Sequence, residues 1–235
     1  MSIETSTVRV GDLSAYLARP TTGSTSGMLL LPMVTGIGEQ VRAWADELAE
    51  RGFTALAWDV FHGISTDNTP REELAAKVGE LRDEQAIAEQ TALLDHLLGE
   101  LGCTTASVMG WCLGGRFALL LAAREPRLSG VVAYHPTVRI PAPPNHDLDA
   151  VELAQRITAP VVLIYPEADT IVSREAFDGL QTALHSRSEG ATFTQFFPGA
   201  EHGFSNAARH GNPVNAEAYA LSWPQTLAFL DMLKG

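Results

Sequence analysis

Short apolar runs alternate with longer segments of helical periodicity from about residue 28 to the end of the chain. Uninterrupted or alternating apolar runs predict strands at residues 28–34, 53–60, 106–109, 128–134, 160–165 and 192–197. Apolar side chains at three- and four-residue spacing predict helices at residues 39–51, 70–102, 113–124, 174–186 and 216–233. Near-continuous apolar strands separated by helices are typical of an α/β fold, in which a mostly parallel central sheet has helices on both faces.

Two segments do not follow this alternation. Residues 1–27 contain apolar positions that alternate on both sides of Gly11–Asp12, which predicts a hairpin at the edge of the sheet. Residues 137–147 contain three prolines and predict an irregular loop, either a plain surface connection or a lid. Because α/β folds of about this size commonly form one unit, we expect a single domain over residues 1–235.

Composition and charge narrow the class of protein. Hydrophobic residues make up 46% of the chain and charged residues 19%, which favours a large buried core over disorder. With 16 Lys and Arg against 28 Asp and Glu, the net charge of −12 disfavours binding to nucleic acid or to an anionic membrane. The longest apolar runs hold about seven residues, whereas a bilayer span needs about 20. The first residues show no signal-peptide pattern and two cysteines make no disulfide framework, so a soluble, cytoplasmic protein is expected.

Residues 110–115, Gly-Trp-Cys-Leu-Gly-Gly, stand between a predicted strand and a predicted helix. This is a nucleophile-elbow pattern with Cys112 at the position more often held by serine. A side chain on such a sharp turn needs small residues two positions before and after it, and Gly110 and Gly114 meet that requirement. The turn also places the sulfur at a helix N-terminus, where the helix dipole favours a thiolate. We therefore predict that Cys112 is a nucleophile, whereas Cys103 has the sequence context of an inert buried thiol.

A cysteine nucleophile needs a base and a group that orients the base, and after an elbow of this kind the expected order is nucleophile, acid, histidine. Asp169 comes just after the predicted strand at 160–165 and is the predicted acid, with Glu167 as its rival. His202 follows the predicted strand at 192–197 and has small neighbours that suit a tight loop. The agreement in order and in position after strands makes these residues the predicted catalytic set.

Other side chains near the ends of strands are candidates for substrate binding. His135 directly follows the predicted strand at 128–134. Trp111 and Phe204 lie next to the predicted nucleophile and base, where they form either an apolar acyl pocket or part of the core. The histidines lack the spacing of metal ligands, and no complete nucleotide-binding glycine motif is present. We therefore expect no metal ion and no cofactor.

Taken together, these motifs make the chain similar to the dienelactone hydrolase family from about residue 8 to residue 234. The resemblance is carried by residues 110–115, by Asp169 with Ile171–Val172 behind it, and by Glu201-His202-Gly203-Phe204. It implies an α/β-hydrolase fold, a three-layer sandwich, with a Cys112–His202–Asp169 triad that hydrolyses a carboxylic ester or lactone. The backbone N–H groups of Val34 and Leu113 are then the expected oxyanion hole. The expected partner is a small-molecule substrate, and the expected assembly is a monomer or a small homo-oligomer.

Two positions depart from the family's pattern. Members often carry a Glu after the first core strand, where it helps to control the resting thiol, and this chain has Met33 there. Dienelactone-specific members resemble H-x-F-x-R at the histidine, with the Arg on a substrate carboxylate, and this chain has Asn206 in place of that Arg. Arg209 and Arg71 are candidate replacements. The sequence therefore does not name the ester or lactone, and Met33 leaves open a non-catalytic or thiol redox-sensing member of the same fold.

Overall fold

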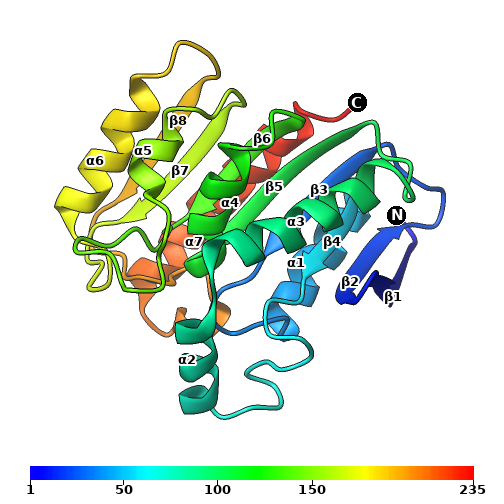
Figure 1. Cartoon of the computed structure of the whole chain (residues 1–235), viewed down its shortest axis with the longest axis horizontal. Coiled ribbons are helices and arrows are strands. Elements are labelled where there is room, and N and C mark those ends of the chain that lie inside the picture. The colour runs from blue at the N-terminus through cyan, green and yellow to red at the C-terminus, as the bar shows by residue number, and fades with distance from the viewer.

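The computed structural model describes residues 1–235, apart from the side chain of Arg71. Its strands are β1 (Ile3–Val10), β2 (Leu13–Pro20), β3 (Ser26–Leu31), β4 (Thr54–Trp58), β5 (Thr105–Trp111), β6 (Leu128–Tyr134), β7 (Val161–Pro166) and β8 (Thr192–Phe197). They form one sheet in the order β1-β2-β4-β3-β5-β6-β7-β8 (Figure 1). All neighbours from β4 to β8 in this order are parallel, whereas β1 and β2 form an antiparallel hairpin that joins β4. The mostly parallel sheet with its edge hairpin is therefore confirmed.

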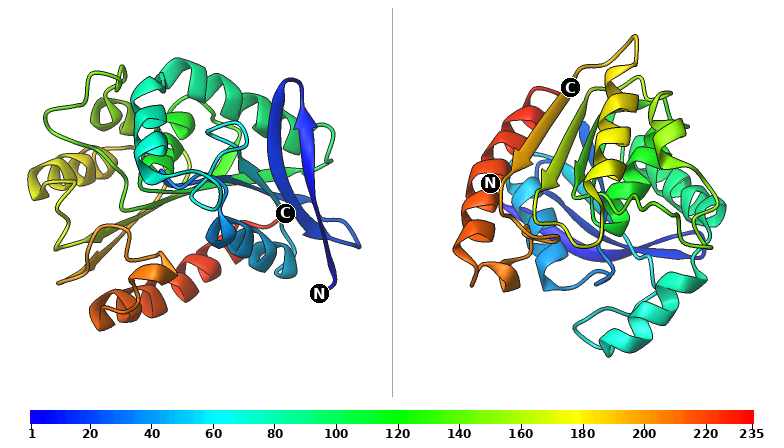
Figure 2. Two further views of the ribbon diagram at one scale, coloured as in Figure 1. Left: turned by 90° about the horizontal axis from the view of Figure 1, so that it is seen from below. Right: turned by 90° about the vertical axis from the view of Figure 1, so that its left-hand side faces the viewer.

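Helices cover both faces of this sheet (Figures 1 and 2). One face carries α1 (Glu39–Glu50) and α7 (Pro213–Asp231), and the other carries α3 (Asp83–Leu98), α4 (Leu113–Ala122), α5 (Ala150–Ala154) and α6 (Arg174–His185). Helix α2 (Arg71–Glu80) projects from one end of the molecule, at the bottom of Figure 1. The predicted three-layer α/β fold is confirmed. Within the described residues, no helix combines the length and the apolar character that a membrane crossing requires.

The core accounts for the apolar pattern of the strands. Every residue of β3, β4 and β7 is buried, as expected for central strands of a parallel sheet that is covered on both faces. On one face, Trp111 of β5 stacks on Trp44 of α1, with ring centroids 3.9 Å apart and planes 8° apart. Trp44 also lies 6.2 Å from the ring of Trp223 in α7. These large side chains anchor both helices beneath the end of β5 that leads into the elbow.

The long helix predicted at 70–102 is in fact two helices. Leu81 (φ −60°, ψ 140°) and Arg82 (φ −120°, ψ 133°) have extended backbones, so the chain between α2 and α3 is not helical. The reason is a buried ion pair: the two oxygens of Asp83 accept hydrogen bonds from the guanidinium of Arg116 at 2.6 and 2.7 Å. This pair sets where α3 begins, and it depends on the position of α4, which the apolar spacing along residues 70–102 does not encode.

Two smaller elements were not predicted, namely α5 and a short 3₁₀ helix, η1 (Ala207–Arg209). Both begin with a polar cap whose side-chain oxygen accepts backbone N–H bonds, Asp149 for α5 and Asn206 for η1. Helix α7 begins at Pro213, three residues before its predicted start. Local capping therefore decides elements that are too short to show a hydrophobic period.

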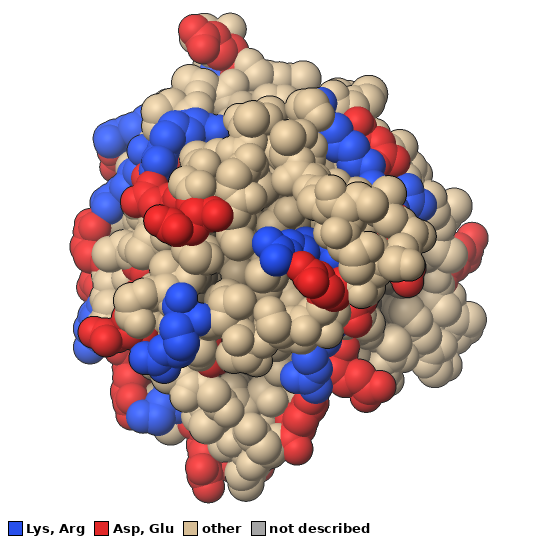
Figure 3. Space-filling model, turned by 90° about the vertical axis from the view of Figure 1, so that its right-hand side faces the viewer, with Lys and Arg blue, Asp and Glu red and all other residues tan. Residues whose placement is uncertain are grey.

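Charged side chains of both signs are interspersed on the face of the molecule that Figure 3 shows. On the face drawn in Figure 3, basic and acidic side chains lie in small groups between uncharged areas. Exposed pairs such as Arg19 Nε with Glu4 Oε1, and Arg127 Nη1 with Asp95 Oδ1, are both 2.6 Å apart. Such exposed pairs contribute little to stability. The face in Figure 3 offers no continuous basic surface of the kind that a nucleic-acid backbone requires.

Candidate active site

Cys112 lies at the turn between β5 and α4 and has backbone angles φ 55° and ψ −114°. A positive φ is strained for a residue with a side chain, so the surrounding structure must hold this turn. A Cβ on Gly110 would overlap the carbonyl of Gly114, and a Cβ on Gly114 would overlap the carbonyl of Leu31. The glycines at these two positions therefore allow β3, β5 and α4 to approach one another, and Cys112 stands at their junction.

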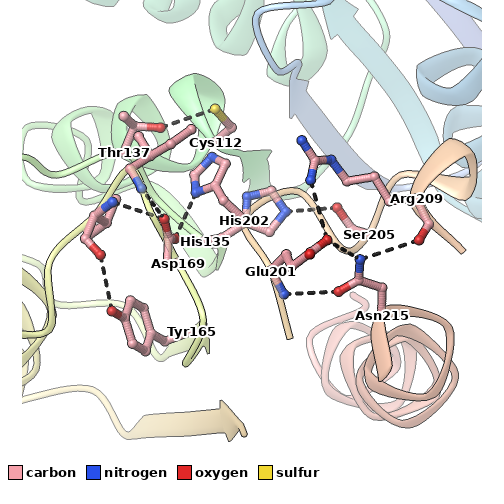
Figure 4. Close-up of polar contacts among 12 residues, drawn as sticks. Cys112, His135, Thr137, Tyr165, Asp169, Glu201, His202, Ser205, Arg209 and Asn215 are labelled. Carbon is pink, nitrogen blue, oxygen red and sulfur yellow. Dashed lines mark hydrogen bonds and ion pairs between the residues drawn. The ribbon is translucent and has the colours of Figure 1, made fainter. Parts of the chain in front are cut away.

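The carboxylate of Asp169 and the ring of His202 reach this junction from the loops after β7 and β8. Oδ1 of Asp169 accepts hydrogen bonds from the backbone N–H groups of Ile171 at 2.8 Å and Val172 at 2.9 Å. Oδ2 is then left to accept from Nδ1 of His202 at 2.7 Å, and the Asp169 side chain is fully buried. In Figure 4 the His202 ring lies between Asp169 and Cys112. The three predicted catalytic side chains are thus brought together.

The charges of Cys112 and His202 stabilise one another. Burial is the largest single influence on the pKa of each group, and it opposes ionisation of both. For Cys112, burial is outweighed by His202, by the hydroxyl of Thr137 and by the backbone N–H of Leu113, so the pKa of the thiol is lowered. For His202, Asp169 and Cys112 outweigh burial and raise the pKa to about 9. Each group therefore favours the charged form of the other, the thiolate of Cys112 and the imidazolium of His202.

Nε2 of His202 has no well-aligned hydrogen-bond partner among the described residues. Its contact with Cys112 nevertheless shifts the pKa of both groups, through hydrogen bonding as well as through charge. A nitrogen in this position is available to exchange a proton with the sulfur or with an atom of a bound molecule.

The sequence patterns did not single out Thr137, which also contacts the sulfur. Its hydroxyl donates a hydrogen bond to Sγ of Cys112 at 3.1 Å (Figure 4). Its backbone N–H donates to the Cys112 carbonyl at 3.0 Å. Thr137 follows β6, which is the neighbour of β5 in the sheet. Its place just after a strand beside the elbow strand is the one sequence signal that points to it, because no motif includes it.

A cavity of about 430 Å³ lies above Cys112 and His202. Its apolar lining consists of Met33, Val34, Leu74, Ala75, Val78 and Ile171. Its remaining lining consists of Thr35, Thr66, Gly203, Asn206 and Arg209, besides the two catalytic candidates. The apolar residues 74, 75 and 78 belong to α2, so the helix that projects in Figure 1 forms part of the wall. A mainly apolar cavity with a few polar groups is typical of small-molecule sites.

Trp111, His135 and Phe204, the predicted substrate-binding residues, are completely buried and do not line this cavity. Trp111 belongs to the tryptophan stack beneath the elbow, because successive strand residues point to opposite faces of a sheet. Nε2 of His135 lies 2.8 Å from Oγ of Ser205, and the His135 ring centroid is 4.9 Å from that of His202. The three side chains therefore pack beside the catalytic candidates without lining the cavity, and direct contact with a substrate stays a prediction for them.

The positions that depart from the family pattern lie at the same cavity. Met33 is 5% exposed and forms part of the wall. Asn206 and Arg209 both line the cavity, and Nη1 of Arg209 lies 3.7 Å from Oε2 of Glu201. The side chain of the other candidate, Arg71, lies outside the described residues. A guanidinium therefore does reach the cavity, three residues later in the chain than the family pattern places it.

Two alternatives for the site chemistry can be compared with this arrangement. Glu167, the rival acid, accepts a hydrogen bond from the backbone N–H of Gly199 at 3.1 Å and does not contact His202. Over the described part of the chain, no cluster of three or more His, Cys, Asp or Glu side chains is placed to hold a metal ion.

Comparisons with known proteins find relatives over nearly the whole chain. The sequence model of the dienelactone hydrolase family matches residues 13–233. Carboxymethylenebutenolidase of Rhodococcus opacus is 30% identical over 216 residues, which cover 89% of this chain and 82% of that protein. A Bradyrhizobium protein named "Probable 2-oxo-3-(5-oxofuran-2-ylidene)propanoate lactonase" is 24% identical over 222 residues, which cover 92% and 88%.

The fold is shared with solved structures as well. The crystal structure of a Klebsiella pneumoniae protein, named as a candidate dienelactone hydrolase, is similar with a TM-score of 0.83 and 23% identity. The similarity covers 98% of this chain and 99% of that one. The chain is therefore a hydrolase that belongs to the dienelactone hydrolase family.

Proposed function

We propose that this hydrolase cleaves a carboxylic ester or lactone through an acyl-enzyme on Cys112, with His202 as the proton carrier and Asp169 as its orienter. The main support is the contact of Asp169 with His202 beside a cavity that Cys112 also lines, with the pKa of the thiol lowered and that of the imidazole raised. A buried thiol without such partners stays protonated and inert. The names of the Rhodococcus and Bradyrhizobium relatives point to the same class of reaction.

In the first half-reaction, the Cys112 thiolate attacks the carbonyl carbon and forms a C–S bond. The electron pair of the carbonyl moves to its oxygen, which accepts hydrogen bonds from the backbone N–H groups of Val34 and Leu113; one such donor is worth about 3 kcal/mol of barrier. The C–O bond to the leaving group then breaks, and the leaving oxygen takes the proton from Nε2 of His202. Asp169 holds Nδ1–H and stabilises the imidazolium until that transfer.

In the second half-reaction, neutral His202 removes a proton from a water molecule that attacks the thioester carbon. The C–S bond breaks, the carboxylic acid leaves, and the thiolate–imidazolium pair is restored. A thiolate also leaves easily, so the first intermediate returns to substrate unless the other leaving group is a weakly basic oxygen. Enol esters, lactones and activated esters therefore suit Cys112 better than amides.

The lining of the cavity supports a substrate of modest size with an apolar part. Met33, Val34 and the α2 side chains offer apolar contact on a cavity of about 430 Å³. We assign the apolar part of the substrate to this wall. Arg209 adds a positively charged side chain to the lining, and its guanidinium also contacts the carboxylate of Glu201. We assign an anionic substituent of the substrate to this guanidinium.

Hydrolysis of p-nitrophenyl acetate tests the proposal directly. We expect turnover in the wild-type protein and a loss of at least about a thousandfold in Cys112→Ala, because the nucleophile is gone. Cys103→Ala is the matched control, since it removes the other free, buried cysteine and should leave turnover unchanged. Mass spectrometry of the acid-quenched reaction should find the acetyl group on the peptide that contains Cys112.

Two outcomes would overturn the proposal. Turnover that survives Cys112→Ala would exclude an acyl-enzyme on this sulfur. Rapid alkylation of Cys112 by iodoacetamide, without turnover of aryl esters, enol esters or lactones, would instead support the thiol-sensing alternative.

A further inference from the structure

Thr137 is tied to Cys112 by both its main chain and its side chain. The backbone bond, at 3.0 Å, joins the start of the loop after β6 to the carbonyl of the strained elbow residue. The side-chain bond, at 3.1 Å, points the hydroxyl at the reactive sulfur. In the described part of the chain this hydroxyl makes no other hydrogen bond. Its position is thus determined by the elbow, and its one polar contact is with the nucleophile.

The direction of this bond decides its chemical effect. A hydroxyl that donates to sulfur gains strength when the sulfur is negatively charged, so it favours the thiolate over the thiol. A carboxylate in contact with the sulfur has the opposite effect, because like charges repel. The thioether of Met33, on the cavity wall, has no proton to donate. Thr137 is therefore a neutral side-chain donor that stabilises the charged sulfur without adding a second charge.

We propose that Thr137 is a further catalytic residue, whose hydroxyl holds the Cys112 sulfur as a ready thiolate before any substrate binds. His202 and Thr137 then act together, because His202 supplies the opposite charge and Thr137 supplies a directed hydrogen bond that fixes the sulfur at the elbow. The same bond forms again when the C–S bond breaks, so it also assists the second half-reaction. The last point rests on the proposed ester hydrolysis, whereas the state of the resting thiol does not.

The test is the pH dependence of Cys112 alkylation by iodoacetamide, in which the thiolate attacks the CH₂ carbon and iodide leaves. Four proteins are compared in a Cys103→Ala background: unchanged Thr137, Thr137→Val, Thr137→Ser and Thr137→Ala. The pairs Thr/Val and Ser/Ala each differ in the hydroxyl. We expect the midpoint to rise by about one pH unit in the Val and Ala proteins, because a hydrogen bond to a charged group is lost. The Ser protein should keep the wild-type midpoint.

Equal midpoints within both pairs would overturn the inference. A rise in Thr137→Ser equal to that in Thr137→Ala would also overturn it, because the methyl group or the loop backbone would then be responsible. If one variant fails to fold by circular dichroism, the other pair still decides.

Ester turnover, measured in the same proteins, separates this inference from the proposed function. Shifted midpoints without turnover in any protein would support Thr137 and refute ester hydrolysis. Cys112-dependent turnover with unshifted midpoints would support ester hydrolysis and refute the role of Thr137.

Discussion

The two cysteines of this chain lie just before and just after the same strand, β5, and both are buried, yet their acidities differ. Burial raises the pKa of Cys103, and a hydrogen bond with Thr54 does not offset it. Burial also opposes ionisation of Cys112, but there His202, Thr137 and a backbone N–H prevail and the pKa falls. A single hydroxyl thus does not offset the rise in thiol pKa that burial causes, whereas a hydroxyl, an imidazolium and a backbone N–H together lower the pKa. Reactivity follows from the partners that face a buried thiol and not from its burial.

Removal of the His202 imidazole should have the largest effect on the difference between the two cysteines. In His202→Ala we expect ester turnover to fall by about a thousandfold, because the proposed proton carrier is lost. The pH midpoint of Cys112 alkylation should rise, since the opposite charge that lowers its pKa is gone. Steady-state kinetics and iodoacetamide titration measure the two effects. His185→Ala, at the exposed end of α6, is the control. An unchanged alkylation midpoint in His202→Ala would show that the imidazole does not set the charge of the sulfur.

A substitution in the elbow should have the next largest effect, on the stability of the fold. Of the two cysteines, Cys112 is the one that stands on a strained turn. In Gly114→Ala the new Cβ meets the backbone of β3, which cannot move aside cheaply. We expect a loss of about 3 kcal/mol in the free energy of unfolding, measured with urea. Gly79→Ala, in α2, has no neighbour within 4 Å of the new Cβ and should gain up to about 1 kcal/mol. Equal stability of the two variants would contradict the close approach at the elbow.

A carboxylate added on the cavity wall should have the smallest effect, and it should shift the alkylation midpoint in the same direction as removal of His202. In Met33→Glu the ionised side chain adds a like charge near the sulfur, so the pKa of Cys112 and the alkylation midpoint should rise by about one pH unit. Met33→Gln has a similar shape without the charge and should stay close to the wild-type midpoint. If the Glu and Gln variants have identical pH profiles, position 33 does not face the sulfur as the cavity lining indicates.

Much of the fold could be predicted from local patterns in the sequence. Central strands such as β3 and β7 are apolar throughout because both sheet faces are covered, and that pattern is visible along the chain. The spacing of Gly110 and Gly114 around Cys112 reflects steric limits within five residues, so it too can be recognised without a structure. The order of Cys112, Asp169 and His202 after strands follows from the same parallel topology.

Other features were decided by tertiary contacts alone. The break before α3 follows from the pairing of Asp83 with Arg116, 33 residues away, and the contact of Thr137 with Cys112 joins two different loops. The periodicity of residues 70–102 is continuous through the break, and no motif marks Thr137. Likewise the burial of His135 depends on the elements packed over it.

The amino-acid sequence by itself determined the layers of this protein, its elbow and the chain order of its candidate catalytic residues, because hydrophobic period and turn sterics act over a few neighbouring positions. The acidity of the thiol, the wall of the cavity and the start of α3 were decided only by the folded structure. They depend on the distance and direction between groups on separate elements, and those quantities exist only once the elements have packed together.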